Sequence, residues 1–437
     1  ITGSVASVNS ETLAAIPVAS ATEALQGKMA GVQITTTEGS PDAQMSIRVR
    51  GGGSITQSNE PLFIVDGFPV ESISDIPPTD IESIDVLKDA SSTAIYGARG
   101  ANGVIIVTTK SGKEGKVSVS YNAYYAWKKV AKTLDVLSAS DYTKWQYELA
   151  QLTNKNDDYI KYFGNYQDLD MYDNVATNDW QDLTFGRTGH SFNHNLSING
   201  GSDKFKYSFS YSHIDDKAIM QMSDYARDNL NLKLNHKPLK NVSLDFSARF
   251  SKTKINGGGS NDANSSLNTD KRLKYSLLYT PYPVPGISDA LNADEEDANS
   301  LLINPLISLR DNDTRKERIN YNLAGSITWE IIKDLKLKAE VGYDDYRNNA
   351  DRYYGVTTYY VRNNVDDEDK SKPAISFTRG TRTAFRSTNT LSYDFKKFFK
   401  NNKNHLNLLA GQEYIVTRER ELRNVVHGFP TEYTADD

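Results

Sequence analysis

The sequence predicts a small α/β domain over residues 1–115, followed over residues 116–437 by part of a transmembrane antiparallel β-barrel. Three observations support this fold class. The second region contains long stretches of alternating apolar and polar residues, as in strands that face lipid on one side and a lumen on the other. Its predicted connections are long at one end of the strands and short at the other. The first region has short strands and glycine-rich turns instead.

The composition narrows the class of protein. The 437 residues are 38% hydrophobic and 24% charged, and no run of 18 apolar residues predicts a transmembrane helix. The 26 tyrosines, against 15 phenylalanines and 4 tryptophans, suit surfaces that are partly apolar and partly wet. A formal charge of −6 disfavours nucleic acid as a partner. The lack of cysteine excludes disulfides, cysteine zinc sites and thiol nucleophiles.

In the first region, Ser20 and Glu23 fit a capping box that opens a helix, and Gly31 is placed to end it. A second short helix, capped by Asp89, is expected to run through Ile95. The expected strands lie at 32–37, 45–50, 62–65, 81–88 and 104–109, with an Asp66-Gly67 turn after the third.

In the second region we expect nine strands, and residues 204–212 show the alternation best. Phe205, Tyr207, Phe209 and Tyr211 face one way, and Lys206, Ser208, Ser210 and Ser212 face the other. The pattern is least regular at 382–395, where Ser387 and Asn389 fall on the apolar face. The expected strands lie near 117–127, 189–200, 203–213, 226–236, 241–253, 318–331, 335–347, 382–395 and 404–418.

The connections distinguish a barrel from a soluble β-sandwich, which would also alternate. Odd-to-even connections have about 60, 12, 60 and 34 residues, whereas even-to-odd ones are tight turns. This asymmetry and the strand length favour the barrel. A barrel that holds a folded domain of this size has about 22 strands, so nine would belong to a protein of roughly 900 residues.

Five segments of the first region resemble the plug domain of TonB-dependent outer-membrane receptors. The resemblance is strongest to the SusC/RagA branch, the nutrient importers of Bacteroidota. It covers residues 1–112 through its motifs and the barrel through its pattern alone. The segments are Ala24–Val32, Ile47–Gly51, Pro61–Gly67, Asp80–Ala90 and Ala94–Val104.

The resemblance implies an outer-membrane importer of an oligomeric nutrient, glycan ahead of peptide, gated by the plug. It implies TonB, with ExbB and ExbD, as the energy-supplying partner through a segment upstream of Ile1. It also implies outer-membrane lipid around the barrel, a SusD-like surface lipoprotein lid, and a dimer of transporter–lid pairs. Two alternatives stay open: a non-transporting surface or secretion-associated barrel, and a siderophore-type receptor.

Seven charged residues within the plug motifs are candidates for an ionic lock, inside the plug or to barrel carboxylates. Arg50 and Glu82 lead, and ordinary surface charge is the alternative, since exposed pairs contribute little. The candidates are Arg48, Arg50, Glu82, Asp85, Lys88, Asp89 and Arg99.

The long connections are rich in aromatic residues that could stack on sugar rings or peptide side chains. They could equally pack the loops or contact a partner protein, and for any single residue we favour that alternative. The candidates are Tyr142, Trp145, Tyr162, Trp180, Tyr275, Tyr279, Tyr353 and Tyr354.

Patterns that carry catalysis are weak, so no enzyme, cofactor or metal site is predicted. There is no Gly-x-Ser-x-Gly, and the Ser-x-x-Lys match at 251–254 lacks its partner motifs. His190 and His194 share a strand face without helical ligand spacing. The acidic run at 366–369 lacks the glycine and spacing of a calcium loop.

Overall fold

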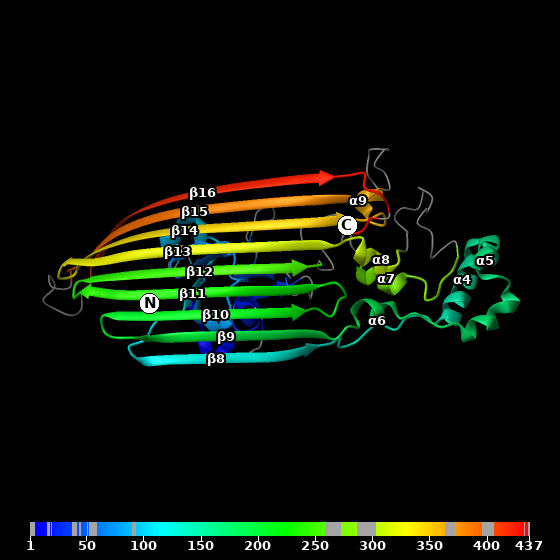
Figure 1. Ribbon diagram of the computed structural model, residues 1–437, viewed down its shortest axis with the longest axis horizontal. Helices are drawn as coiled ribbons and strands as arrows, with labels where there is room; N and C mark the ends of the chain where they lie inside the picture. The colour runs from blue at the N-terminus through cyan, green and yellow to red at the C-terminus, as the bar shows by residue number, and fades with distance from the viewer. Residues whose placement is uncertain are drawn as a thin grey trace.

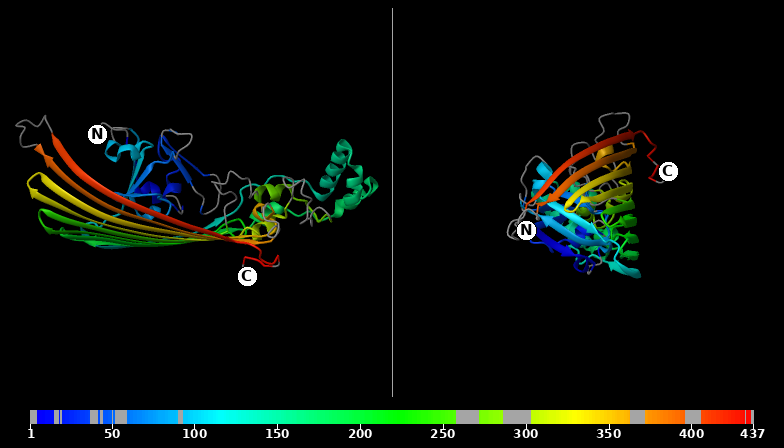
Figure 2. Two further views of the ribbon diagram at one scale, coloured as in Figure 1. Left: turned by 90° about the horizontal axis from the view of Figure 1, so that it is seen from above. Right: turned by 90° about the vertical axis from the view of Figure 1, so that its left-hand side faces the viewer.

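The computed structural model describes residues 5–14, 18, 20–36, 42, 45–49, 51, 59–89, 93–257, 272–285, 303–362, 372–395, 406–431 and 433–435. A long, curved sheet dominates the molecule (Figure 1). The α/β domain lies in the concave side of this sheet, and a group of helices lies beyond one end of the strands (Figure 2).

The curved sheet has nine antiparallel strands in chain order, each paired with the next, so the expected nine strands are confirmed. β15 begins eight residues earlier than expected, because its ladder with β14 continues to the pair Tyr354 and Ala374. The strands are β8 (Gly115–Lys128), β9 (Gly189–Gly201), β10 (Phe205–Lys217), β11 (Asp224–Leu239), β12 (Val242–Asn256), β13 (Thr314–Ile332), β14 (Leu335–Tyr354), β15 (Ala374–Asp394) and β16 (Asn407–Val426).

The connections confirm the expected asymmetry. Tight turns join β9 to β10, β11 to β12 and β13 to β14 at one end, called here the turn end (Figure 1). The opposite, loop end carries the helices; its β10–β11 connection, residues 218–223, is shorter than expected. The helices are α4 (Ala139–Thr153), α5 (Asn156–Phe163), η3 (Tyr166–Asn174), α6 (Trp180–Phe185), α7 (Arg272–Leu278), α8 (Pro305–Arg310) and α9 (Tyr359–Arg362).

The α/β domain contains a five-stranded sheet of order β1-β6-β7-β4-β5 and a separate β2–β3 hairpin. Buried aliphatic side chains from the sheet, the hairpin and α2 form one core, separate from the curved sheet. The elements are β1 (Val5–Asn9), α1 (Ser10–Ala14), α2 (Ala21–Ala24), β2 (Val32–Thr36), β3 (Met45–Val49), β4 (Leu62–Val65), β5 (Phe68–Val70), η1 (Pro78–Asp80), β6 (Ile81–Leu87), η2 (Ala94–Gly100) and β7 (Val104–Thr109).

The two helices expected in this domain differ from the prediction. The Ser20 hydroxyl accepts from the Glu23 N–H as expected, but α2 ends at Ala24 and turns lead on to Gly31, which has a positive φ of 73°. The second helix is the 3₁₀ segment η2, which is interrupted at Gly97 (φ 58°). These turns bury Leu25 and Met29 without continuing the helix, so tertiary packing outweighs helix propensity here.

The two faces of the curved sheet follow the predicted alternation. Ser208, Ser210 and Ser212 of β10 are buried, 4–6% exposed, on the face that meets the α/β domain. Phe205, on the opposite face, is 42% exposed. The polar positions therefore face the inner domain and the aromatic positions face outward, as expected of a lumen and a lipid surface.

Candidate functional site

The candidate site is the seam between the inner domain and the concave wall formed by β9 to β16. On the domain side, the seam consists mainly of the segment from Asp66 to Asp80, which runs along the wall, and Asp42 and Arg99 add contacts from outside this segment. Asp66 and Gly67 make a hairpin turn between β4 and β5, both with positive φ (52° and 85°). Such a turn requires residues that tolerate left-handed backbone, and Asp-Gly is a preferred pair.

Asp66 is the centre of the contact at the turn end of the seam. Its carboxylate accepts from the Thr109 N–H (2.9 Å), the Thr109 hydroxyl (2.7 Å) and the Lys233 ammonium of β11 (2.7 Å). The side chains of Asp66 and Lys233 are 11% and 15% exposed. Burial raises the pKa of Asp66, but Lys233 and Arg249 outweigh it, so this pKa lies below its ordinary value.

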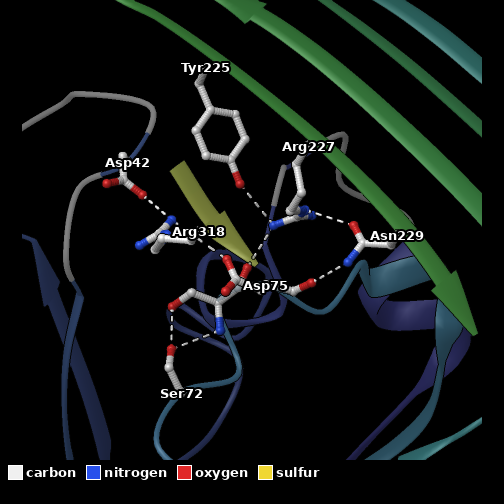
Figure 3. A network of polar contacts seen from close by, with 8 residues as sticks. Asp42, Ser72, Asp75, Tyr225, Arg227, Asn229 and Arg318 are labelled. Carbon is white, nitrogen blue, oxygen red and sulfur yellow. Dashed lines mark hydrogen bonds and ion pairs between the residues drawn. The ribbon is translucent and has the colours of Figure 1, made fainter. Parts of the chain in front are cut away.

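A second group of contacts lies toward the loop end, where β11 and β13 meet the domain (Figure 3). The Arg227 guanidinium, on a residue only 2% exposed, donates to the Ser74 carbonyl (2.8 Å). Its neighbour Asn229 donates to the Asp75 carbonyl (2.7 Å). Arg318 of β13 pairs with Asp42 (2.5 Å) and with the Asp75 carboxylate (3.6 Å). The wall therefore supplies the cations and the domain supplies the anions and carbonyls.

β15 adds two further arginines to the wall. Arg382 pairs with Glu71 of the domain (2.9 Å) and with Asp344 of the neighbouring strand (3.6 Å). Arg386 donates to the Gly67 carbonyl and pairs with Glu413 of β16 (2.8 Å).

Among the predicted charged residues that the structure describes, Arg99 is the one that lies against the wall. It pairs with Glu413 at 2.8 Å, so Glu413 joins Arg99 of the domain to Arg386 of the wall. This is a domain-to-barrel ion pair of the kind expected from the sequence. Whether it gates anything stays a prediction.

One contact of the seam is steric. The Phe68 ring, on a residue 4% exposed, lies against Gly342 of β14. A Cβ added at Gly342 would lie 2.4 Å from the Phe68 ring carbons, far inside contact distance. Only glycine lets the ring approach the wall this closely.

Asp80 is the most deeply placed carboxylate of the segment, 4% exposed. The Asn195 amide of β9 donates to it at 3.4 Å, and the Ser210 hydroxyl is a second partner. Burial raises the pKa of Asp80 despite these hydrogen bonds.

Three cavities follow one another along the seam, among the described residues. The cavity at the loop end has a volume of about 500 Å³ and is lined by Asp75, Tyr225 and Arg318 among others. The cavity at the turn end, about 480 Å³, is lined by Asp66, Lys233 and Arg386 among others. A small cavity of about 50 Å³, next to Asp80, lies between them. The contacts described above therefore close a hollow seam at several points.

The other predicted plug residues lie away from the seam contacts. Glu82 is 3.7 Å from Lys113, and both side chains are well exposed (45% and 79%). Asp85 accepts from the Ser83 hydroxyl, and Lys88 donates to the Ala30 carbonyl. The Asp89 carbonyl accepts from the Thr93 N–H, and Arg48 is exposed on β3. Arg50 lies outside the described residues, so the Arg50/Glu82 lock stays a prediction.

Sequence reasoning missed the carboxylates that hold the seam, which are Asp42, Asp66, Glu71 and Asp75. A signal for their partners was present, because several lumen-facing positions of the strands carry Lys or Arg. No periodicity indicates which carboxylates these cations meet.

The loop aromatics mostly pack on one another. Tyr142 and Tyr282 belong to a buried cluster with Phe163, and Tyr162 packs against it. Trp180 donates to the Thr280 carbonyl (2.8 Å) and meets Tyr279 edge-on.

The remaining loop candidates are buried to different degrees. Tyr275 is half-buried. Tyr353 donates to the Tyr433 carbonyl (2.7 Å), and Tyr354 stacks on Tyr360. Trp145 is 48% exposed and is the candidate most open to a ligand or partner.

Within the described residues, no helix is long and apolar enough to span a membrane. The same residues contain no cluster of three or more His, Asp or Glu side chains that could hold a metal ion.

The similarities to known proteins extend over both the inner domain and the wall. The family model described as TonB-dependent Receptor Plug Domain matches residues 1–104. "TonB-dependent receptor SusC" of Bacteroides thetaiotaomicron is 38% identical over 52% of this chain and 22% of its own length. "TonB-dependent receptor P3" of Formosa agariphila is 31% identical over 95% of this chain and 38% of its own length. The chain thus spans less than two fifths of these relatives.

Solved structures agree on the architecture. The structure titled "Structure of the RagAB peptide transporter" matches with a TM-score of 0.76 and 27% identity, over 98% of this chain and 49% of that one. The ferric citrate transporter FecA matches with a TM-score of 0.58 and 12% identity, over 98% of this chain and 49% of that one, a likeness of fold alone.

Proposed function

Since the chain belongs to the SusC/RagA branch of the TonB-dependent outer-membrane receptors, we propose that the whole protein imports an oligomeric nutrient across the outer membrane. The inner domain is the plug, and it would be the gate of this import. In this proposal the barrel is the passage, and the seam is where the passage opens.

The observation that carries the proposal is the polar character of the seam. The plug has its own apolar core, whose residues come from the plug's sheet, hairpin and helix. Apart from the Phe68 ring against Gly342, its contacts with the wall described above are ion pairs and hydrogen bonds, such as Asp66–Lys233 and Arg227 to the Ser74 carbonyl. Water can replace polar contacts of this kind, so the plug can shift without exposing an apolar core.

Moving the plug needs energy, because several partly buried charged contacts would break together. Hydrogen bonds to charged groups contribute about 1.5–3 kcal/mol each. The inner membrane offers about 2.3 kcal/mol per charge per 100 mV. We expect TonB, with ExbB and ExbD, to transmit this energy through a segment upstream of the plug.

We keep glycan ahead of peptide as the cargo, as the resemblance to the SusC/RagA branch implies. RagAB, by its printed title, transports peptide, so peptide stays the second choice. We also propose a SusD-like surface lipoprotein lid over the loop end. The exposed apolar side chains Trp145 (48%), Leu152 (83%) and Met171 (73%) of the outer loops support such a contact. A dimer of transporter–lid pairs stays a prediction.

The test is uptake by cells that carry the full-length protein, with fluorescently labelled glycan and peptide oligomers offered in parallel. We expect uptake of one class to depend on this protein and to vanish when TonB is deleted. A matched strain that expresses the protein without TonB controls for passive entry. No uptake at normal protein levels would support the non-transporting alternative, and uptake that persists without TonB would contradict TonB-dependent import.

A further inference from the structure

The two sides of the seam carry charges of opposite sign. The described wall residues of β11, β12, β13 and β15 place six cations toward the plug. The plug meets them with carboxylates and carbonyls. The cations are Arg227, Lys233, Arg249, Arg318, Arg382 and Arg386, and the plug carboxylates are Asp42, Asp66, Glu71 and Asp75.

The described residues that line the two larger cavities show the same separation of charge between wall and plug. At the loop end the plug contributes five carboxylates and no lysine or arginine, while the sheet side contributes four cations against two carboxylates. At the turn end the sheet side again contributes four cations against two carboxylates, and the plug contributes Asp66. The wall is therefore net positive along the seam, and the plug face that covers it is net negative.

The cations form a track along the strands. Arg227 and Lys233 lie six residues apart on β11, which is about 20 Å of strand. Arg318 is beside Arg227 in the ladder, with Thr253 between them. Arg382 and Arg386 extend the track across β15, and Arg382 is opposite Tyr346. A length of this order suits an extended oligomer better than a single compact chelate.

The cations of the track are partly buried, so each of them needs an anionic partner. The side chains of Lys233, Arg318 and Arg382 are 15%, 19% and 18% exposed, with plug carboxylates beside them. A partly buried cation that loses its carboxylate pays a desolvation cost without compensation. If the plug segment leaves the wall, the track therefore favours whatever anion can take its place.

We propose that the cargo is an acidic glycan, an oligomer with carboxylate or sulfate groups, and that the plug carboxylates occupy its sites at rest. The cargo and the plug segment then compete for the same cations. Binding of cargo to the wall loosens the segment from Asp66 to Asp80, and departure of the cargo lets the segment return. This inference rests on the proposed import function and adds the substrate class.

If cargo and plug compete for the wall cations, the two partners of an ion pair should affect cargo binding in opposite directions. A purely structural role of the pair does not predict this. Removing a plug carboxylate should strengthen cargo binding, because a competitor is lost. Removing its wall partner should weaken cargo binding, because a site is lost. If the pair only held the fold together, both changes would act in the same direction. Glu71 and Arg382 suit this test, because the Glu71 side chain is 60% exposed and its replacement should not disturb folding.

The experiment measures binding of hexagalacturonate and of maltohexaose, a neutral oligomer of equal length, to the purified full-length protein. We expect hexagalacturonate to bind at least about tenfold more tightly than maltohexaose, with a difference that shrinks as salt rises. Glu71→Gln should tighten hexagalacturonate binding by about threefold, and Arg382→Gln should weaken it by about tenfold. Glu11→Gln, at an exposed position of helix α1 in the plug, is the matched control and should change nothing.

Equal binding of the two glycans, or a change in the same direction for Glu71→Gln and Arg382→Gln, would overturn the inference. Tighter binding of a hexaglutamate peptide than of hexagalacturonate would overturn the glycan assignment. These measurements need no TonB. Failure of the import function appears as TonB-independent or absent uptake, whereas failure of this inference appears in the sign of the binding changes.

Discussion

At the residue scale, the contact between Phe68 and Gly342 sets how closely the plug approaches the wall. The Phe68 ring is buried, and it lies so close to Gly342 that a Cβ at this position would clash with the ring. Close-packed interiors respond to added volume by moving side chains or backbone, which costs about 1–3 kcal/mol. Here the strain can be relieved if the plug shifts away from the wall.

We therefore expect Gly342→Val to loosen the plug and to make cells more permeable to an antibiotic that an intact outer membrane excludes by size, such as vancomycin. Gly325→Ala is the control, because a Cβ there has its nearest contact at an ordinary 3.8 Å. The double variant Gly342→Val with Phe68→Ala should restore much of the barrier. Unchanged antibiotic sensitivity in the Gly342→Val strain at normal protein levels would show that the plug accommodates the extra volume.

At the element scale, strands such as β10 and β12 present a polar face to the plug and an apolar face outward. Inward positions are not equivalent, however. Ser208 is buried and donates to Asn199 (2.6 Å), so it would not tolerate a large side chain. Ser247 lines the cavity of about 480 Å³ at the turn end, where an added side chain has space.

Phe246 and Ser247 make a matched pair for testing the two faces, since they are neighbours on β12 at nearly the same depth. Phe246 is 41% exposed on the outer face. Arginine there should cost about 2–4 kcal/mol if the residue lies near the bilayer midplane. Ser247→Arg should cost much less. Folding into lipid vesicles at increasing urea measures both, and equal destabilisation would contradict the assignment of faces.

At the scale of the whole molecule, the plug is held on two sides. The segment from Asp66 to Asp80 is bound to β11 and β13, and Arg99 is bound to β16 through Glu413. If cargo displaces the segment alone, the first attachment must break during import and the second need not. If the whole plug leaves the barrel, both must break.

The absence of cysteine lets each attachment be tethered with a bifunctional thiol reagent. We expect a tether between Asp66→Cys and Lys233→Cys to abolish TonB-dependent uptake. One between Arg99→Cys and Glu413→Cys should leave uptake largely intact. The same variants before addition of the reagent are the controls. Loss of uptake with both tethers would indicate that the whole plug moves.

The sequence alone determined the nine strands, the direction of their faces and the unequal length of their connections. These features follow from a two-residue period and from turn residues, both of which are local. The plug was indicated by five ordered motifs. The predicted strand bounds fail where the alternation weakens. The early part of β15 lies outside its predicted apolar pattern, but it still pairs with β14.

Only the tertiary structure decided which charges meet across the seam. Arg318 and Asp42 are separated by 276 positions, and Lys233 and Asp66 by 167. Their contact depends on the register of several strands and on how the plug lies in the barrel. Neither leaves a periodic trace in the sequence. The charged residues of the motifs therefore indicate Glu82, which is exposed. Asp66, the carboxylate that is buried against the wall, also lies in a motif, but its sequence context predicts only a turn.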